Sequence, residues 1–214
     1  TADLTGLAGK TINALVLNNN NTTASTINVM GTGAGQTLAV TSGAMLFTLN
    51  TGAAASSANN IVLGGFNSGI TVGSTNEYIF HVVNPSSVAT TATLQAVITS
   101  PLTSTADITK SGRGTLTLTS VNTAGGGSTK TTINEGVLQI SDLDNIGGNT
   151  GGLVFAGGTL KLAAASASPA ILDYSGDDIS TRTITFLQGG GTLDTNGFNL
   201  ALANTLGSGI GGFT

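Results

Sequence analysis

Short runs in which apolar and polar residues alternate recur along the whole chain, and this period of two predicts β-strands. Glycine, asparagine or serine bounds most of the runs and marks the turns between them. No long stretch repeats apolar residues at spacings of three and four, so helix signals are nearly absent. We therefore expect an all-β fold, with strands at residues 11–17, 26–30, 37–40, 44–49, 61–63, 78–83, 92–98 and 114–119.

A short pattern, Gly-x-Leu-x-aliphatic, repeats at a fixed interval in the second half of the chain. Its copies occupy residues 114–118, 136–140 and 158–162, so the interval between successive copies is the same both times. Related sequences at 152–155 and 191–194 indicate that one period holds more than one strand. A unit of this length, with short strands and Gly or Asn corners, fits one coil of a parallel β-helix, in which each coil needs a stacked neighbour to bury its apolar side.

The interval also predicts which side chains stack. Leu116, Leu138 and Leu160 should lie one above another in an interior file, with coils about 4.8 Å apart. An antiparallel sandwich would normally need two-residue hairpins instead. Asn196-Gly197 is such a pair, but most other junctions are longer.

The period further predicts the extent of the stack. Dividing the length of the chain by the interval from Gly114 to Gly136 gives about ten coils. The strict period is lost upstream, so we expect irregular coils over residues 1–105 and regular, repeat-bearing coils over residues 106–214, together forming one continuous solenoid.

The composition predicts a polar but nearly uncharged surface. Only 7% of the residues are charged and 32 are Gly, whereas ordinary domains carry about 25% charged residues. The net charge of −4 and the scattered Lys and Arg residues argue against nucleic-acid binding, which needs clustered cations. The chain has no cysteine for disulfides or thiolate metal sites, and no apolar run approaches the roughly 18 residues of a membrane-spanning helix.

Residues 110–140 follow the order of a known repeat. They read Lys-x-Gly-x-Gly-Thr-Leu-x-Leu, then Asn-Thr, a Gly-rich turn, and Thr-x-Ile-Asn-x-Gly-x-Leu-x-aliphatic. This stretch resembles the autotransporter-associated β-strand repeat, also called the passenger-associated transport repeat. The resemblance covers residues 106–200 well and the earlier half only in style. One departure is Ala124, which stands where an aromatic residue usually follows Asn-Thr.

The resemblance implies a right-handed parallel β-helix that is secreted across an outer membrane and displayed on the bacterial cell surface. It implies no active site and no cofactor. From it we expect a structural or adhesive stalk or fibre segment, which associates with itself or contacts surface or host glycans or proteins. Passive help during secretion is a further alternative, in which C-terminal coils fold first outside the cell.

A carbohydrate-active enzyme, either a polysaccharide hydrolase or a lyase, is the alternative from a different class. Parallel β-helices also carry such activities, and Asp177 with Asp178 resembles a pair of acids that flank a glycosidic bond as general acid and base. No Gly-His-Gly accompanies the pair, and the only histidine, His81, lies far upstream in a strand-like run. We therefore predict two solvated loop carboxylates and a strand histidine rather than a catalytic site.

A possible calcium loop is weaker still. Asp142 and Asp144 precede Gly147 roughly as carboxylate ligands precede the glycine of such a loop. Ile146 occupies a ligand position, however, and the later bidentate Glu is absent. We predict an ordinary loop here, with calcium as the alternative.

Threonines at residues 115–119 and 181–185 resemble the threonine ladders of ice-binding β-helices. Such a ladder needs the same rank of threonines on successive coils, but Gln139 and Lys161 replace Thr117 on the next two. We therefore interpret these threonines as ordinary strand residues, favoured by their β-branched shape.

Overall fold

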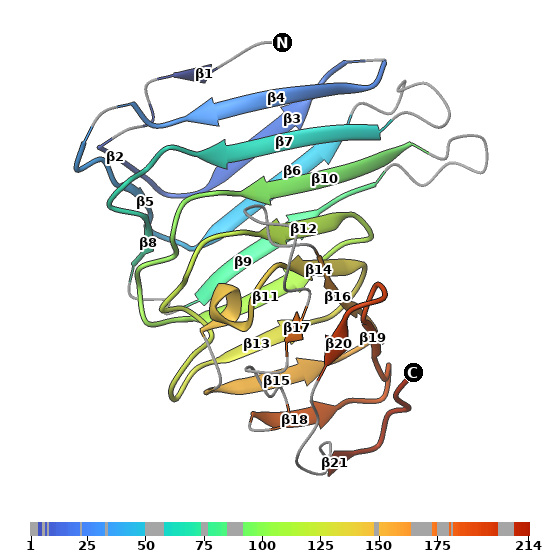
Figure 1. The fold of residues 1–214 in the computed structure, drawn as a ribbon. Helices are drawn as coiled ribbons and strands as arrows, with labels where there is room; N and C mark the ends of the chain where they lie inside the picture. Colours follow the sequence, from blue (N-terminus) through green and yellow to red (C-terminus); the bar gives the residue numbers. More distant parts are fainter. Residues whose placement is uncertain are drawn as a thin grey trace.

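The computed structural model confirms the predicted parallel β-helix (Figure 1). All strand pairs that its described residues form are parallel. The coils follow one another in chain order, from blue at one end of the stack to red at the other (Figure 1). The described residues are 4–5, 7, 9–21, 23–32, 34–49, 58–73, 77–84, 92–147, 150–163, 173–174, 180, 182–200 and 208–214.

Two long sheets form the main walls of the coils, and each has eight strands among the described residues. The first contains, in spatial order, β1 (Leu4–Thr5), β4 (Ser25–Met30), β7 (Ala58–Gly64), β10 (Thr93–Ile98), β12 (Thr115–Leu118), β14 (Val137–Ile140), β16 (Thr159–Leu162) and β19 (Thr192–Asp194). Because β10 pairs with β12, this sheet runs without a break past residue 105.

The second long sheet has the same kind of order, with each strand beside its counterpart one coil away. It contains β3 (Leu15–Asn19), β6 (Ala44–Leu49), β9 (Glu77–Val82), β11 (Asp107–Ser111), β13 (Lys130–Ile133), β15 (Gly152–Phe155), β18 (Thr183–Phe186) and β21 (Ser208–Gly209).

Smaller elements complete the coils. A short sheet contains β2 (Lys10–Ile12), β5 (Leu38–Val40) and β8 (Ile70–Val72), and a two-stranded sheet contains β17 (Asp173–Tyr174) and β20 (Asn199–Leu200). A 3-10 turn, η1 (Leu143–Ile146), precedes β15. In the part of the chain that the structure describes, no helix is long and apolar enough to cross a membrane.

The strand predicted at 11–17 is two strands in the structure. β2 belongs to the short sheet and β3 to the second long sheet, and the chain turns between them at Asn13 and Ala14. The next coil turns beside this corner, since the backbone N–H groups of Thr41 and Ser42 donate to the carbonyl groups of Ile12 and Asn13. The apolar alternation continues through the corner, so a prediction from periodicity alone merges the two strands into one.

Leu116, Leu138 and Leu160 stack as predicted. They are register partners in β12, β14 and β16, and all three side chains are fully buried. Their neighbours Gln139 and Lys161 point outward and stay partly exposed. Strand alternation therefore sends every second side chain into the core, where each aliphatic contributes roughly 1.5–3 kcal/mol.

The coils differ in length, which explains why the described residues give eight strands in each long sheet rather than about ten coils. Leu138 follows its partner Leu116 by one period of the repeat. In the first half, Ile61 is the partner of Ile27 and Ala96 is the partner of Ile61, so those coils contain more residues. The period of the second half therefore overestimates the number of coils.

Candidate functional site

Lys110 lies inside the stack, in a file that is otherwise apolar. It is fully buried in β11, where its register partners are Phe80 in β9 and Ile133 in β13. Strand alternation explains this position, because Ile108, two residues earlier in β11, is buried as well. A lysine is almost never fully buried unless its ammonium group has partners.

Three backbone carbonyl groups at two stacked corners hold the ammonium group of Lys110. Nζ donates to the carbonyl oxygens of Ser111, at 2.9 Å, and Gly112 in its own corner, and to that of Glu135, at 3.0 Å, in the next coil. One side chain therefore ties two successive corners together. Since Lys110 is the first residue of the repeat at 110–140, this motif position has an architectural role.

The buried amine should give the protein an unusual pH dependence. Burial lowers the pKa of Lys110 from 10.5 to about 8, and the Glu135 carboxylate offsets only part of this effect. Between these two pH values the unfolded chain binds more protons than the folded chain, so stability increases with pH. We expect the free energy of unfolding, measured by urea denaturation, to rise by about 1.6 kcal/mol between pH 8 and pH 9.5.

Lys110→Met is the matched control, because it keeps an apolar stem and removes the titrating amine. Its free energy of unfolding should stay nearly constant over the same window, and an equally flat wild-type curve would contradict a buried ammonium group. The window ends at pH 9.5 because burial raises the pKa of Tyr78 above 10.0. Tyrosine ionisation in the unfolded chain would then lower the stability at higher pH.

A second buried cation ties another set of corners. Arg182, just before β18, donates from Nη2 to the carbonyl oxygens of Gly125 at 2.7 Å and Ile146 at 2.8 Å, which belong to the two preceding coils. Burial lowers the pKa of this guanidinium to about 10. Arg182 therefore stays charged at neutral pH and, like Lys110, satisfies carbonyl groups of more than one coil.

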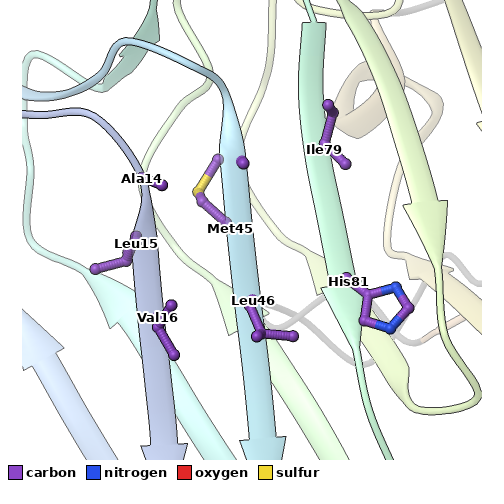
Figure 2. Close-up of a pocket in the computed structure, with 8 residues that line it drawn as sticks. Ala14, Leu15, Val16, Met45, Leu46, Ile79 and His81 are labelled. Carbon is purple, nitrogen blue, oxygen red and sulfur yellow. The ribbon is translucent and has the colours of Figure 1, made fainter.

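A shallow apolar hollow of about 160 Å³ lies on the outer face of β3, β6 and β9 (Figure 2). Val16, Leu46 and His81 are register partners across it, and Ala44 pairs with Ile79 in the adjacent file. Val16 is 64% exposed, whereas most large aliphatic side chains among the described residues are buried. Figure 2 shows the imidazole of His81 pointing away from Leu46, at the border of the hollow.

A second hollow, of about 290 Å³, adjoins the first at His81, which lines both. Asn84, Arg113 and Glu135 also line it. Arg113 Nε and Glu135 Oε1 form an ion pair of 3.1 Å, with 66% and 50% of their side chains exposed. His81 Nδ1 shares a hydrogen bond of 2.8 Å with Ser111 Oγ in the next coil. The two hollows together change from aliphatic to charged along one face.

The acids selected from the sequence do not form a site in the described part of the chain. Asp177 and Asp178 lie outside the described residues. Asp142 caps η1, since its Oδ1 accepts a hydrogen bond from Asp144 N at 2.8 Å, and Ile146 is buried in the core. Within the described ranges, no group of three His, Cys, Asp or Glu residues is placed to hold a metal ion. The possible calcium loop is a capped turn in this structure.

The row of threonines is interrupted at the positions that the sequence predicts. Thr117 pairs in register with Gln139, and Gln139 pairs with Lys161. On the other side of Thr117, its hydroxyl accepts a hydrogen bond of 2.7 Å from Gln95 Nε2. The register partner of Thr117 on that side is Val97, so this outer file carries mixed side chains rather than a uniform row of threonines.

Sequence reasoning missed both the buried cations and the two hollows. Lys110 had a detectable signal, because it follows Ile108 at the spacing of an inward-facing strand residue. The hollows had none, since Val16, His81 and Arg113 belong to coils of unequal length. Only the register of the folded chain brings these residues to one face.

Comparisons with known proteins identify no relative: no protein-family model, curated protein or solved structure matches the chain. The functional proposal therefore depends on the repeat at 110–140 and on the contacts that its residues make.

Proposed function

We propose that this chain is a structural or adhesive segment of an extracellular stalk or fibre, within a secreted, autotransporter-like bacterial surface protein. We further propose that it has no catalytic activity. The observation that carries the proposal is the contact of Lys110 with two stacked corners. It gives the first residue of the repeat a role in joining coils, as expected of a scaffold built by repetition.

Glycines of the same motif support this interpretation. Gly136 has a φ of 69°, and a Cβ atom on it would lie 2.5 Å from Gly112 O and 2.6 Å from Gly114 O. Contacts that short force the backbone to move. Three motif glycines therefore meet where two successive coils approach closely, and their spacing serves the stacking of the coils.

The outer face of the first long sheet also suits a scaffold that touches other molecules. Asn60 Nδ2 donates to Thr26 Oγ1 at 3.2 Å across two coils, as Gln95 donates to Thr117. Such hydrogen bonds hold amide and hydroxyl groups in place along the stack. The result is a mainly polar face whose charged groups include the ion pair of Lys161 and Asp194, and such a face favours contacts with glycans or with another copy of the chain.

Immunogold electron microscopy of intact source cells, with antibodies raised against the purified chain, tests the location. We expect gold particles on the outside of unpermeabilised cells, on projections from the surface. Sedimentation velocity at increasing concentration tests self-association as a separate property. Labelling found only inside sectioned cells would contradict the proposal.

An activity assay tests the absence of catalysis. We expect no release of reducing sugar or unsaturated product from a panel of acidic and neutral polysaccharides. Asp177→Asn is the informative variant if any release is seen. If this substitution abolishes the activity, the scaffold proposal is contradicted and the chain is a carbohydrate-active enzyme instead.

A further inference from the structure

Positive charge gathers at the polar hollow of a chain that is acidic as a whole. Arg113 lines this hollow, and the ammonium group of Lys110 binds the carbonyl group of Gly112, which lines it too. Glu135 is the only acid among the lining residues. Two of the six Lys and Arg residues of a chain with net charge −4 therefore lie at one corner. This local excess favours an anionic ligand over a cationic one.

The ion pair at this corner is easily displaced. Arg113 Nε contacts Glu135 Oε1, and both side chains are at least half exposed. Exposed pairs of this kind contribute little, because water and salt compete for them. A ligand carboxylate can take the place of Glu135 and form a bidentate contact with the guanidinium, which is the stronger geometry.

The adjoining apolar hollow selects a different part of the ligand. Aliphatic groups of Val16, Leu46 and Ile79 line it, and its lining includes no Phe, Tyr or Trp ring on which a sugar or base could stack. It meets the polar hollow at His81. Together the two hollows reach the range of about 300–1,000 Å³ that is typical of small-molecule sites.

We propose that the two hollows form one binding site for an aliphatic carboxylate. The alkyl chain of the ligand lies over Leu46 and Ile79, and the carboxylate of the ligand replaces Glu135 at Arg113. His81 stands at the junction, within reach of the carboxylate end. The site goes beyond the scaffold function and does not depend on it.

Titration of the labelled protein with sodium hexanoate, followed by two-dimensional amide NMR spectra, tests the proposal. We expect saturable shifts of the amide signals of Leu46, His81 and Gly112. Hexanol has the same chain without the charge, and hexylamine has the opposite charge. Hexanol should bind at least about threefold more weakly than hexanoate, and hexylamine should give no saturable shifts at these residues.

Three variants locate the carboxylate. Arg113→Gln should weaken hexanoate binding by about fivefold or more, and Glu135→Gln should strengthen it about two- to threefold by removing the competing acid. Lys161→Gln removes a partly exposed cation from the other long sheet and should leave binding unchanged. Equal binding of hexanol and hexanoate, shifts that do not saturate, or an Arg113→Gln variant that binds like the wild type would each overturn the proposal.

Discussion

Replacing Gly136 by alanine should lower the free energy of unfolding by about 2–5 kcal/mol. The residue has a left-handed backbone conformation, with a φ of 69°, and this costs an L-residue roughly 1–2 kcal/mol. The added methyl group would also lie 2.5 Å from Gly112 O, in the preceding coil. Backbone atoms cannot move aside as a flexible side chain does, so overpacking adds about 1–3 kcal/mol. Urea denaturation measures the loss.

Gly127→Ala separates the two contributions. Gly127 has a similar φ of 63°, but an added Cβ would have nothing within 4 Å among the described residues. It should therefore show the conformational cost alone, about 1–2 kcal/mol. Equal losses at Gly127 and Gly136 would mean that the coils do not approach each other closely at the motif corner.

Shortening the central side chain of the stacked leucines should lower the stability by a comparable amount. We expect Leu138→Ala to lower the free energy of unfolding by about 2–5 kcal/mol, because the side chain is fully buried and its loss leaves a cavity. Leu116 in the preceding coil and Leu160 in the following coil are held by their own strands, so they cannot collapse into the space. Chemical denaturation at neutral pH measures the change.

The neighbouring residue provides the control. Gln139 is on the same strand but faces outward and is partly exposed. Gln139→Ala should change the stability by no more than about 0.5 kcal/mol. If Gln139→Ala costs as much as Leu138→Ala, the two faces of β14 have been assigned wrongly.

The sequence was sufficient for the architecture where its period is strict. Leu116, Leu138 and Leu160 could be placed in one file because equal spacing leaves few ways to stack coils. In the first half, partners such as Ile27 and Ile61 lie farther apart along the chain, and the longer connecting segments hide the match. Local patterns there predict strands but not which strands are neighbours.

The site was less predictable than the fold for a related reason. Lysine is normally a surface residue, so its residue type alone would predict that Lys110 faces solvent. The strand register instead places Lys110 between Phe80 and Ile133. Burial of its amine becomes intelligible only once the carbonyl group of Glu135 in the next coil is seen to accept a hydrogen bond. Tertiary register, rather than local propensity, decides such positions.

Cross-strand nuclear Overhauser contacts test the central claim, that strands separated by one period of the repeat are parallel neighbours in register. For isotopically labelled protein, the account predicts backbone contacts from Gln139 to the strand of Thr117 on one side and to that of Lys161 on the other, with the pattern of parallel strands. Contacts between facing Hα atoms that join residues 137–140 to residues 130–133, as in an antiparallel hairpin, would contradict it.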